Sequence, residues 1–154
     1  MSVPTPPPAR DPLTPVEERF MRSLTRLLAV LPRKLDADLV RSTGISATDY
    51  FVLVHVSEAP EQRMRMSDLA AGAAMSMSGI SRVIDRLQKA GLVRRDRSPD
   101  DGRGWDAVLT DLGLQELREA WVVHLASART HIFDHVGELD LDAVADMFQR
   151  MADS

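Results

Sequence analysis

The residues best suited to specific chemistry are the arginines and small polar residues between Arg63 and Trp105. This segment contains nine Lys and Arg residues against five Asp and Glu residues, although the whole chain of 154 residues has a net charge of −4. Arginine binds phosphates and the edge of guanine through paired hydrogen bonds. A basic segment inside an acidic chain therefore points to nucleic acid, while a chance cluster of solvated charges is the alternative.

Residues 76–90 have the pattern of a helix that could enter the major groove of DNA. A serine can cap its start, and Gly91 ends it. Its apolar positions recur at helical spacing and predict one buried face. Arg82 and Arg86 lie one turn apart on the opposite face, behind a slim polar tip that suits the groove. The candidate DNA-reading residues on this helix are Ser76, Met77, Ser78, Ser81, Arg82 and Arg86.

The chain after this helix predicts a β-hairpin. Residues 92–97 and 105–109 alternate roughly in polarity and flank a turn-rich stretch. Arg103 in that stretch could enter the narrow minor groove, and Asp101 could hold the arginine by a charge-assisted hydrogen bond. A short helix from about Ser67, the longer helix and the hairpin together predict a winged helix-turn-helix.

Three motifs make residues 20–152 similar to the multiple antibiotic resistance regulator (MarR) family. They are Ser-Met-Ser-Gly-Ile-Ser-Arg-Val-Ile-Asp-Arg-Leu-Gln-Lys-Ala-Gly-Leu-Val-Arg-Arg at 76–95, Asp-Asp-Gly-Arg at 100–103 and Val-Leu-Thr-Asp-Leu-Gly at 108–113. One departure is Gly102, where the family often has a second arginine. The resemblance implies a triangular homodimer that binds a near-palindromic operator in double-stranded DNA and is released by a small-molecule effector. The effector would lie between the dimer helices and the DNA-binding lobe, near residues 50–55 and the start of the fifth helix, with its chemistry left open.

The flanking segments predict further helices. Thr14 to Glu17 forms a capping box, after which apolar residues follow at helical spacing until Pro32 ends the helix, kinks it or lets it continue to Gly44. A second capping box at 46–49 starts a mostly apolar helix that should be buried. Thr110 caps a fifth helix that reaches about Val136, and a sixth spans about 140–152. Apolar stripes at both ends of the chain favour pairing of two copies, because burying them stabilises by ~25 cal/mol per Å².

These features predict a mainly α fold with a small β-hairpin wing, in which N- and C-terminal helices form a dimer. We interpret residues 1–12 as a disordered proline-rich arm and residues 13–154 as one domain. Within that domain, residues 13–44 and 111–152 are the expected dimerisation helices and 46–110 the DNA-binding lobe. The sequence contains no cysteine, which excludes disulfide and thiolate chemistry. No signal peptide or membrane span is apparent, so we expect a cytoplasmic protein.

The predicted function is that of a homodimeric, sequence-specific transcriptional regulator, a repressor rather than an enzyme, with no cofactor. None of the common catalytic motifs occurs. Two alternatives stay open: a winged-helix module that binds protein instead of DNA, and a metal-sensing regulator. The second rests on His131 and His135, whose spacing of four could place both on one helix face, with His124 and His55 as further candidates. Without cysteine or a clear third ligand, we expect no metal site.

Overall fold

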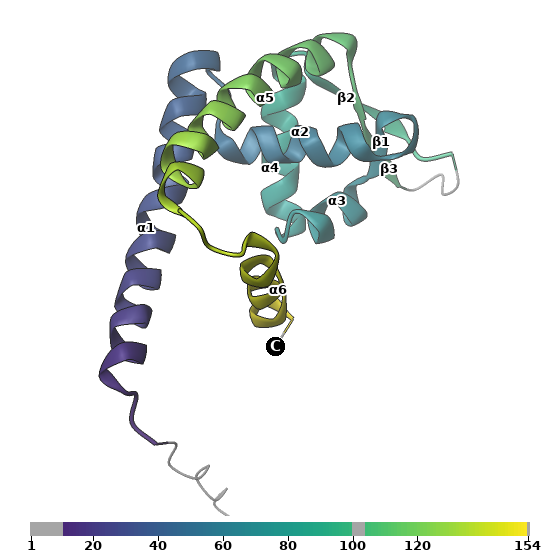
Figure 1. Ribbon diagram of the computed structural model, residues 1–154. Coiled ribbons are helices and arrows are strands. Elements are labelled where there is room, and N and C mark those ends of the chain that lie inside the picture. Colours follow the sequence, from purple (N-terminus) through teal and green to yellow (C-terminus); the bar gives the residue numbers. More distant parts are fainter. Residues whose placement is uncertain (1–10, 100–103, 154) are drawn as a thin grey trace, which may run out of the picture.

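The computed structural model describes residues 11–99 and 104–153 and consists mainly of helices with one small sheet (Figure 1). The elements in chain order are α1 (Pro15–Thr43), α2 (Ala47–Glu58), the 3-10 turn η1 (Pro60–Gln62), β1 (Arg63–Arg65), α3 (Met66–Gly72), α4 (Met77–Lys89), β2 (Val93–Arg97), β3 (Trp105–Leu109), α5 (Asp111–His131), the 3-10 turn η2 (Phe133–His135) and α6 (Leu141–Ala152). The winged helix-turn-helix predicted from the sequence is confirmed. Among the described residues, no helix has the length and apolar character needed to cross a membrane.

Helix α1 begins where its capping box predicts and runs through Pro32. The Glu17 amide donates to the Thr14 hydroxyl (3.3 Å), and the Thr14 amide donates to the Glu17 carboxylate (2.7 Å). Pro32 lacks the amide hydrogen that would reach the Leu28 carbonyl, but Leu28 and Pro32 are both exposed, so water can satisfy that carbonyl. The helix therefore continues to Thr43, and Gly44 ends it in the left-handed conformation (φ 75°).

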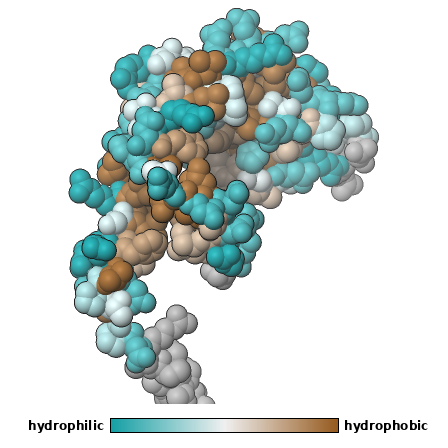
Figure 2. Space-filling model, viewed as in Figure 1, coloured by the Kyte–Doolittle hydropathy of each residue, from teal (hydrophilic) through white to brown (hydrophobic). Residues whose placement is uncertain are grey.

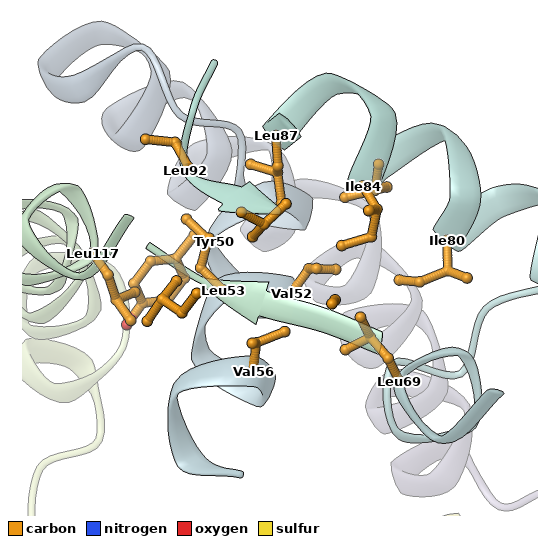
Figure 3. Packing of buried hydrophobic residues seen from close by; sticks show 14 of the residues in the cluster. Tyr50, Val52, Leu53, Val56, Leu69, Ile80, Ile84, Leu87, Leu92 and Leu117 are labelled. Carbon is orange, nitrogen blue, oxygen red and sulfur yellow. The ribbon is translucent and has the colours of Figure 1, made fainter. Parts of the chain in front are cut away.

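The core surrounds α2, which is the central buried helix as predicted. Tyr50, Val52, Leu53 and Val56 project from it toward α3, α4, β3 and α5 (Figure 3). The buried stripe of α4 packs against them and consists of Ile80, Val83, Ile84 and Leu87. This packing leaves the opposite face of α4 exposed, as a helix that reads DNA requires.

The sheet contains one strand that the sequence interpretation missed. Its order is β1-β3-β2, and both pairings are antiparallel. Asp96 and Asp106 lie opposite each other in the β2–β3 register. The Arg63 guanidinium from β1 donates to both carboxylates, at 3.1 and 3.2 Å. This arginine offsets the repulsion between the two acidic residues and fixes β1 to the hairpin.

Helix α5 joins the hairpin through a close backbone contact. The Thr110 hydroxyl donates to the carbonyl of Gly91 (2.7 Å) and accepts the amide of Gly113 (3.0 Å). A Cβ atom on Gly113 would lie 2.0 Å from the Leu92 carbonyl oxygen. The Leu-Thr-x-x-Gly pattern therefore has a steric cause, because only glycine lets the first turn of α5 approach the end of α4 and the start of β2 so closely.

One predicted helix boundary was wrong. Helix α5 ends at His131 and not near Val136, because Ile132 leaves helical geometry (φ −124°, ψ −69°) and the chain forms η2. Helix α3 starts at Met66, within one residue of the predicted start near Ser67. Helix α6 occupies its predicted range, where Asp140 caps it and none of its residues is buried.

We expect Gly113→Ala to destabilise the protein. The added methyl group meets a backbone carbonyl that cannot move without disturbing the hairpin, so the free energy of unfolding should fall by at least about 1–3 kcal/mol in urea denaturation. Gly72→Ala is a matched control, because its Cβ would have only ordinary contacts at 3.7 Å, with the His55 ring. Equal stability of the two variants would contradict the steric explanation.

Candidate nucleic-acid interface

A tight turn sets the angle between α3 and α4. Ala74 adopts a left-handed conformation (φ 51°), and the Met75 amide donates to the Ala70 carbonyl at 2.9 Å. Buried side chains on both helices, Leu69 and Ile80, enter the same core. The turn and the core together hold α4 with its N-terminus pointing outward.

The tip of α4 is small and polar. The Ser76 hydroxyl accepts the Gly79 amide (3.1 Å) and lies 3.2 Å from the Ser78 hydroxyl. Ser76, Met77 and Ser78 are exposed, with Met77 half exposed. Each of these three side chains can therefore meet a partner at the helix tip.

Arg82 and Ser81 lie one turn further along α4. Arg82 is exposed, and its Nε atom donates to the Ser78 carbonyl of its own helix (3.2 Å). This bond uses only the Nε atom of the guanidinium. Ser81 is half-buried, and its carbonyl accepts a hydrogen bond from Arg95 of β2 (3.2 Å). Of these two residues, Arg82 has the better geometry for contacting a base.

Arg86 has a partner that the sequence interpretation did not identify. Its guanidinium binds the Asp49 carboxylate of α2 with two nitrogens, the Nε atom at 3.2 Å. Asp49 is buried, and its hydrogen bonds raise the pKa of Arg86 above its ordinary value. The second capping box is thus incomplete: Ser46 accepts the Asp49 amide, but the carboxylate turns to Arg86. Arg86 connects α4 to α2, so a role in reading DNA stays a prediction with weaker support than that of Arg82.

The hairpin extends beyond α4 on the side away from α1 (Figure 1). The Ser98 amide donates to the Gly104 carbonyl (3.1 Å), which closes the two strands. Asp101 and Arg103 lie outside the described residues, so their predicted roles are not placed by the structure. In the described part of the hairpin, the Arg97 guanidinium stacks over the ring of Trp105 at 4.2 Å. This pair stiffens the base of the wing with a cation–π contact.

An open groove of about 820 Å³ runs between α4 and the wing. Met77, Ser81 and Asp85 line it from α4, and Arg95 and Trp105 from the hairpin. Arg65 of β1 also reaches the groove and donates to the Ser98 hydroxyl (3.3 Å). The sequence interpretation missed this surface. The acidic Asp85 of α4 and the basic Arg95 of β2 lie on different elements, and only the tertiary structure brings them together.

The histidines do not share one helix face. His131 ends α5 and His135 lies in η2. His131 Nε2 lies 2.9 Å from the Asp38 carboxylate, which also accepts from the Ser127 hydroxyl (2.6 Å), and these bonds lower the pKa of Asp38. His124 packs 4.8 Å from the Tyr50 ring, and burial lowers its pKa. In residues 11–99 and 104–153 no group of three potential metal ligands is found.

This geometry defines the class of protein as a winged helix-turn-helix with additional terminal helices. Solved structures with the same fold include two regulators from Streptomyces coelicolor. Sco3205, crystallised in complex with DNA, is 33% identical, has a TM-score of 0.86 and matches over 93% of this chain and 90% of its own. AbsC is 35% identical, has a TM-score of 0.86 and matches over 94% of this chain and 97% of its own.

The sequence pattern described as the MarR family matches residues 43–104. The chain belongs to the MarR family, as the resemblance predicted. The transcriptional repressor MprA of Escherichia coli is 28% identical over 99 residues, or 62% of this chain. The chain matches 56% of the length of that repressor. These relatives are regulators, which confirms the expectation of a regulator rather than an enzyme.

We expect Arg86→Gln to act on stability. Removing the guanidinium leaves the buried Asp49 carboxylate without its partner, so the free energy of unfolding should fall by about 1–3 kcal/mol in urea denaturation. Arg82→Gln, one turn earlier on the same helix, is the matched control and should stay within about 0.5 kcal/mol of wild type. If the Arg86→Gln variant is as stable as wild type but binds DNA more weakly, Arg86 contacts DNA instead.

Proposed function

We propose that the protein is a homodimeric transcriptional repressor that binds a near-palindromic DNA operator. The observation that carries the proposal is the exposed tip and outer face of α4, held outward by the core beside a β-hairpin. The proposal draws further support from Sco3205, a relative crystallised with DNA, and from MprA, which is named a repressor.

In this proposal the tip of α4 enters the major groove. Ser76, Met77, Ser78 and Ser81 approach base edges and phosphates, and Arg82 reads a guanine or clamps a phosphate. Arg103, positioned by Asp101, contacts the minor groove from the wing. Two lobes of a dimer would place their α4 helices about 34–36 Å apart, one turn of DNA.

The proposed dimer is supported by apolar side chains that the single chain leaves exposed. Figure 2 shows hydrophobic residues along α1 and around α6 on one face of the molecule. Helix α1 contributes Phe20 and Leu27, α5 contributes Trp121 and Leu125, and α6 contributes Phe148; each is 46% to 49% exposed. Exposed apolar area of this extent on three helices at the two ends of the chain is characteristic of an interface.

A small-molecule effector is the third part of the proposal. The rings of Tyr50 and Phe51 on α2 lie 4.8 and 5.7 Å from the His124 ring of α5, centroid to centroid. Trp121, also on α5, lies 6.4 Å from the His124 ring. His124 Nδ1 is buried and has no hydrogen-bond partner among the residues that the structure describes. The cluster lies where the DNA-binding lobe meets α5, a proposed dimer helix. A ligand bound beside the cluster could therefore change the angle between the lobe and α5.

Variants of the two DNA-reading elements should behave differently. Arg82→Ala should cost about 1–3 kcal/mol and relax the preference at one position in each half-site. Arg103→Ala should weaken binding to most sequences and reduce the salt slope by about one unit per subunit. Asp101→Ala should have part of that effect, because the arginine keeps its charge but loses its partner. The measurement is fluorescence anisotropy at several salt concentrations, with an operator selected by the wild type from random DNA and a scrambled duplex.

Arg118→Ala is the charge-matched control for these titrations, because Arg118 is exposed on α5 outside the lobe. It should bind like wild type. If Arg82→Ala changes neither affinity nor preference and Arg103→Ala leaves affinity and slope intact, DNA binds elsewhere on the protein. A salt-independent interaction would favour the protein-binding alternative.

Removing α6 should abolish the dimer. Deleting residues from Glu138 onward removes the apolar face that α6 contributes, so the protein should become monomeric or aggregate and lose operator affinity. Sedimentation equilibrium gives the mass directly. Phe148→Ser should weaken the dimer in the full-length chain, whereas Gln149→Ser, an exposed polar neighbour, should not. A truncated protein that stays dimeric and binds normally would refute the assignment.

A further inference from the structure

The groove between α4 and the wing contains an arginine whose charge is already paired. Arg95 Nη1 lies 2.7 Å from the Asp85 carboxylate, and Arg95 Nη2 donates to the Ser81 carbonyl (3.2 Å). The Arg95 side chain is 26% exposed and that of Asp85 is 51% exposed. Water therefore reaches the carboxylate more easily than the guanidinium, and the bond to Ser81 keeps Arg95 in the groove when Asp85 turns away.

The position of the groove determines what part of DNA would occupy it. This step rests on the proposed function, in which α4 enters the major groove and the wing enters the adjacent minor groove. A sugar-phosphate strand separates two adjacent grooves, so it must pass between the helix and the hairpin. That strand would meet Arg95, with Asp85 directly beside it.

A carboxylate at this place opposes binding. A phosphate near Asp85 experiences repulsion, and Arg95 together with Asp85 carries no net charge. Counterion release depends on positive charge that neutralises phosphates, so the paired arginine adds little to it. The acidic residue therefore lowers the affinity of this surface for the phosphate backbone.

We propose that Asp85 competes with the DNA backbone for Arg95 and thereby limits sequence-independent binding. In the free protein the carboxylate holds the guanidinium. On DNA, a phosphate takes the place of Asp85 at Nη1, while Nη2 stays on the Ser81 carbonyl. Because the new phosphate contact replaces an existing ion pair, it adds little to the binding free energy. The contacts of the α4 tip with bases therefore decide the affinity for DNA.

The alternative is a purely structural pair that fixes the wing to α4. The two hypotheses predict opposite signs for one substitution. If the pair is only structural, Asp85→Asn loosens the wing and weakens DNA binding. If Asp85 competes with phosphate, Asp85→Asn releases Arg95 and tightens binding.

The test compares Asp85→Asn and Arg95→Gln with wild type on the wild-type-selected operator and on a scrambled duplex. We expect Asp85→Asn to bind both duplexes more tightly, with a salt slope steeper by about one unit per subunit, because phosphate contacts carry no sequence information. Arg95→Gln should bind both duplexes more weakly, because the negative charge of Asp85 then has no positive partner and repels the phosphates. Glu119→Gln removes the same charge from an exposed site on α5 and should leave both affinities unchanged.

An Asp85→Asn affinity equal to or below that of wild type would overturn the inference. Wild-type protein that binds neither duplex would refute DNA binding itself, so the two failures are distinguishable. If Asp85→Asn does not fold by circular dichroism, Gln88→Glu replaces it, because Gln88 also lines the groove and leaves the pair intact. An added carboxylate there should weaken binding to both duplexes, and unchanged binding would exclude a phosphate strand in the groove.

Discussion

The packing of α4 against α2 determines which residues of α4 face outward. The apolar stripe of α4 fixes the rotation of the helix about its own axis, because any turn would expose Ile80 or Ile84, which are fully buried. The pair between Arg86 and the buried Asp49 adds a directional constraint that apolar contacts lack. With the rotation set, Ser76, Met77, Ser78 and Arg82 have only the outward face available.

The same constraint connects the lobe to the terminal helices. The end of α4 leads through Gly91 (φ 77°) into β2, and Thr110 binds the carbonyl of Gly91 as it caps α5. Helix α5 then packs along α1, where Asp38 accepts hydrogen bonds from Ser127 and His131. A tilt of α5 relative to α1 would therefore move the hairpin and α4 together. This coupling would give the proposed effector near α2 and α5 a mechanical path to the proposed DNA-reading surface.

Sequence patterns predicted the elements whose signals are local. Helical periodicity and caps gave α1, α2, α4 and α6, and the Leu-Thr-x-x-Gly motif gave the start of α5. Strand β1 was missed because three residues, Arg-Met-Arg, carry no pattern of their own and become a strand only by pairing with β3. The partners of Arg86 and Arg95 were missed for the same reason, since Asp49 is 37 residues away from Arg86 in the chain. Charges can be counted from a sequence, but their pairing depends on tertiary structure.

The ion pairs also change the interpretation of the basic segment. The excess of arginine between Arg63 and Trp105 indicated nucleic acid, yet several of these arginines bind carboxylates. Arg63 holds Asp96 and Asp106, Arg86 holds Asp49, and Arg95 holds Asp85. A large unpaired positive surface would bind any DNA by counterion release, and specificity would then depend on a small difference between large affinities. In the proposed function, paired arginines would keep the sequence-independent attraction low, so a few contacts at the tip of α4 would dominate the choice of site.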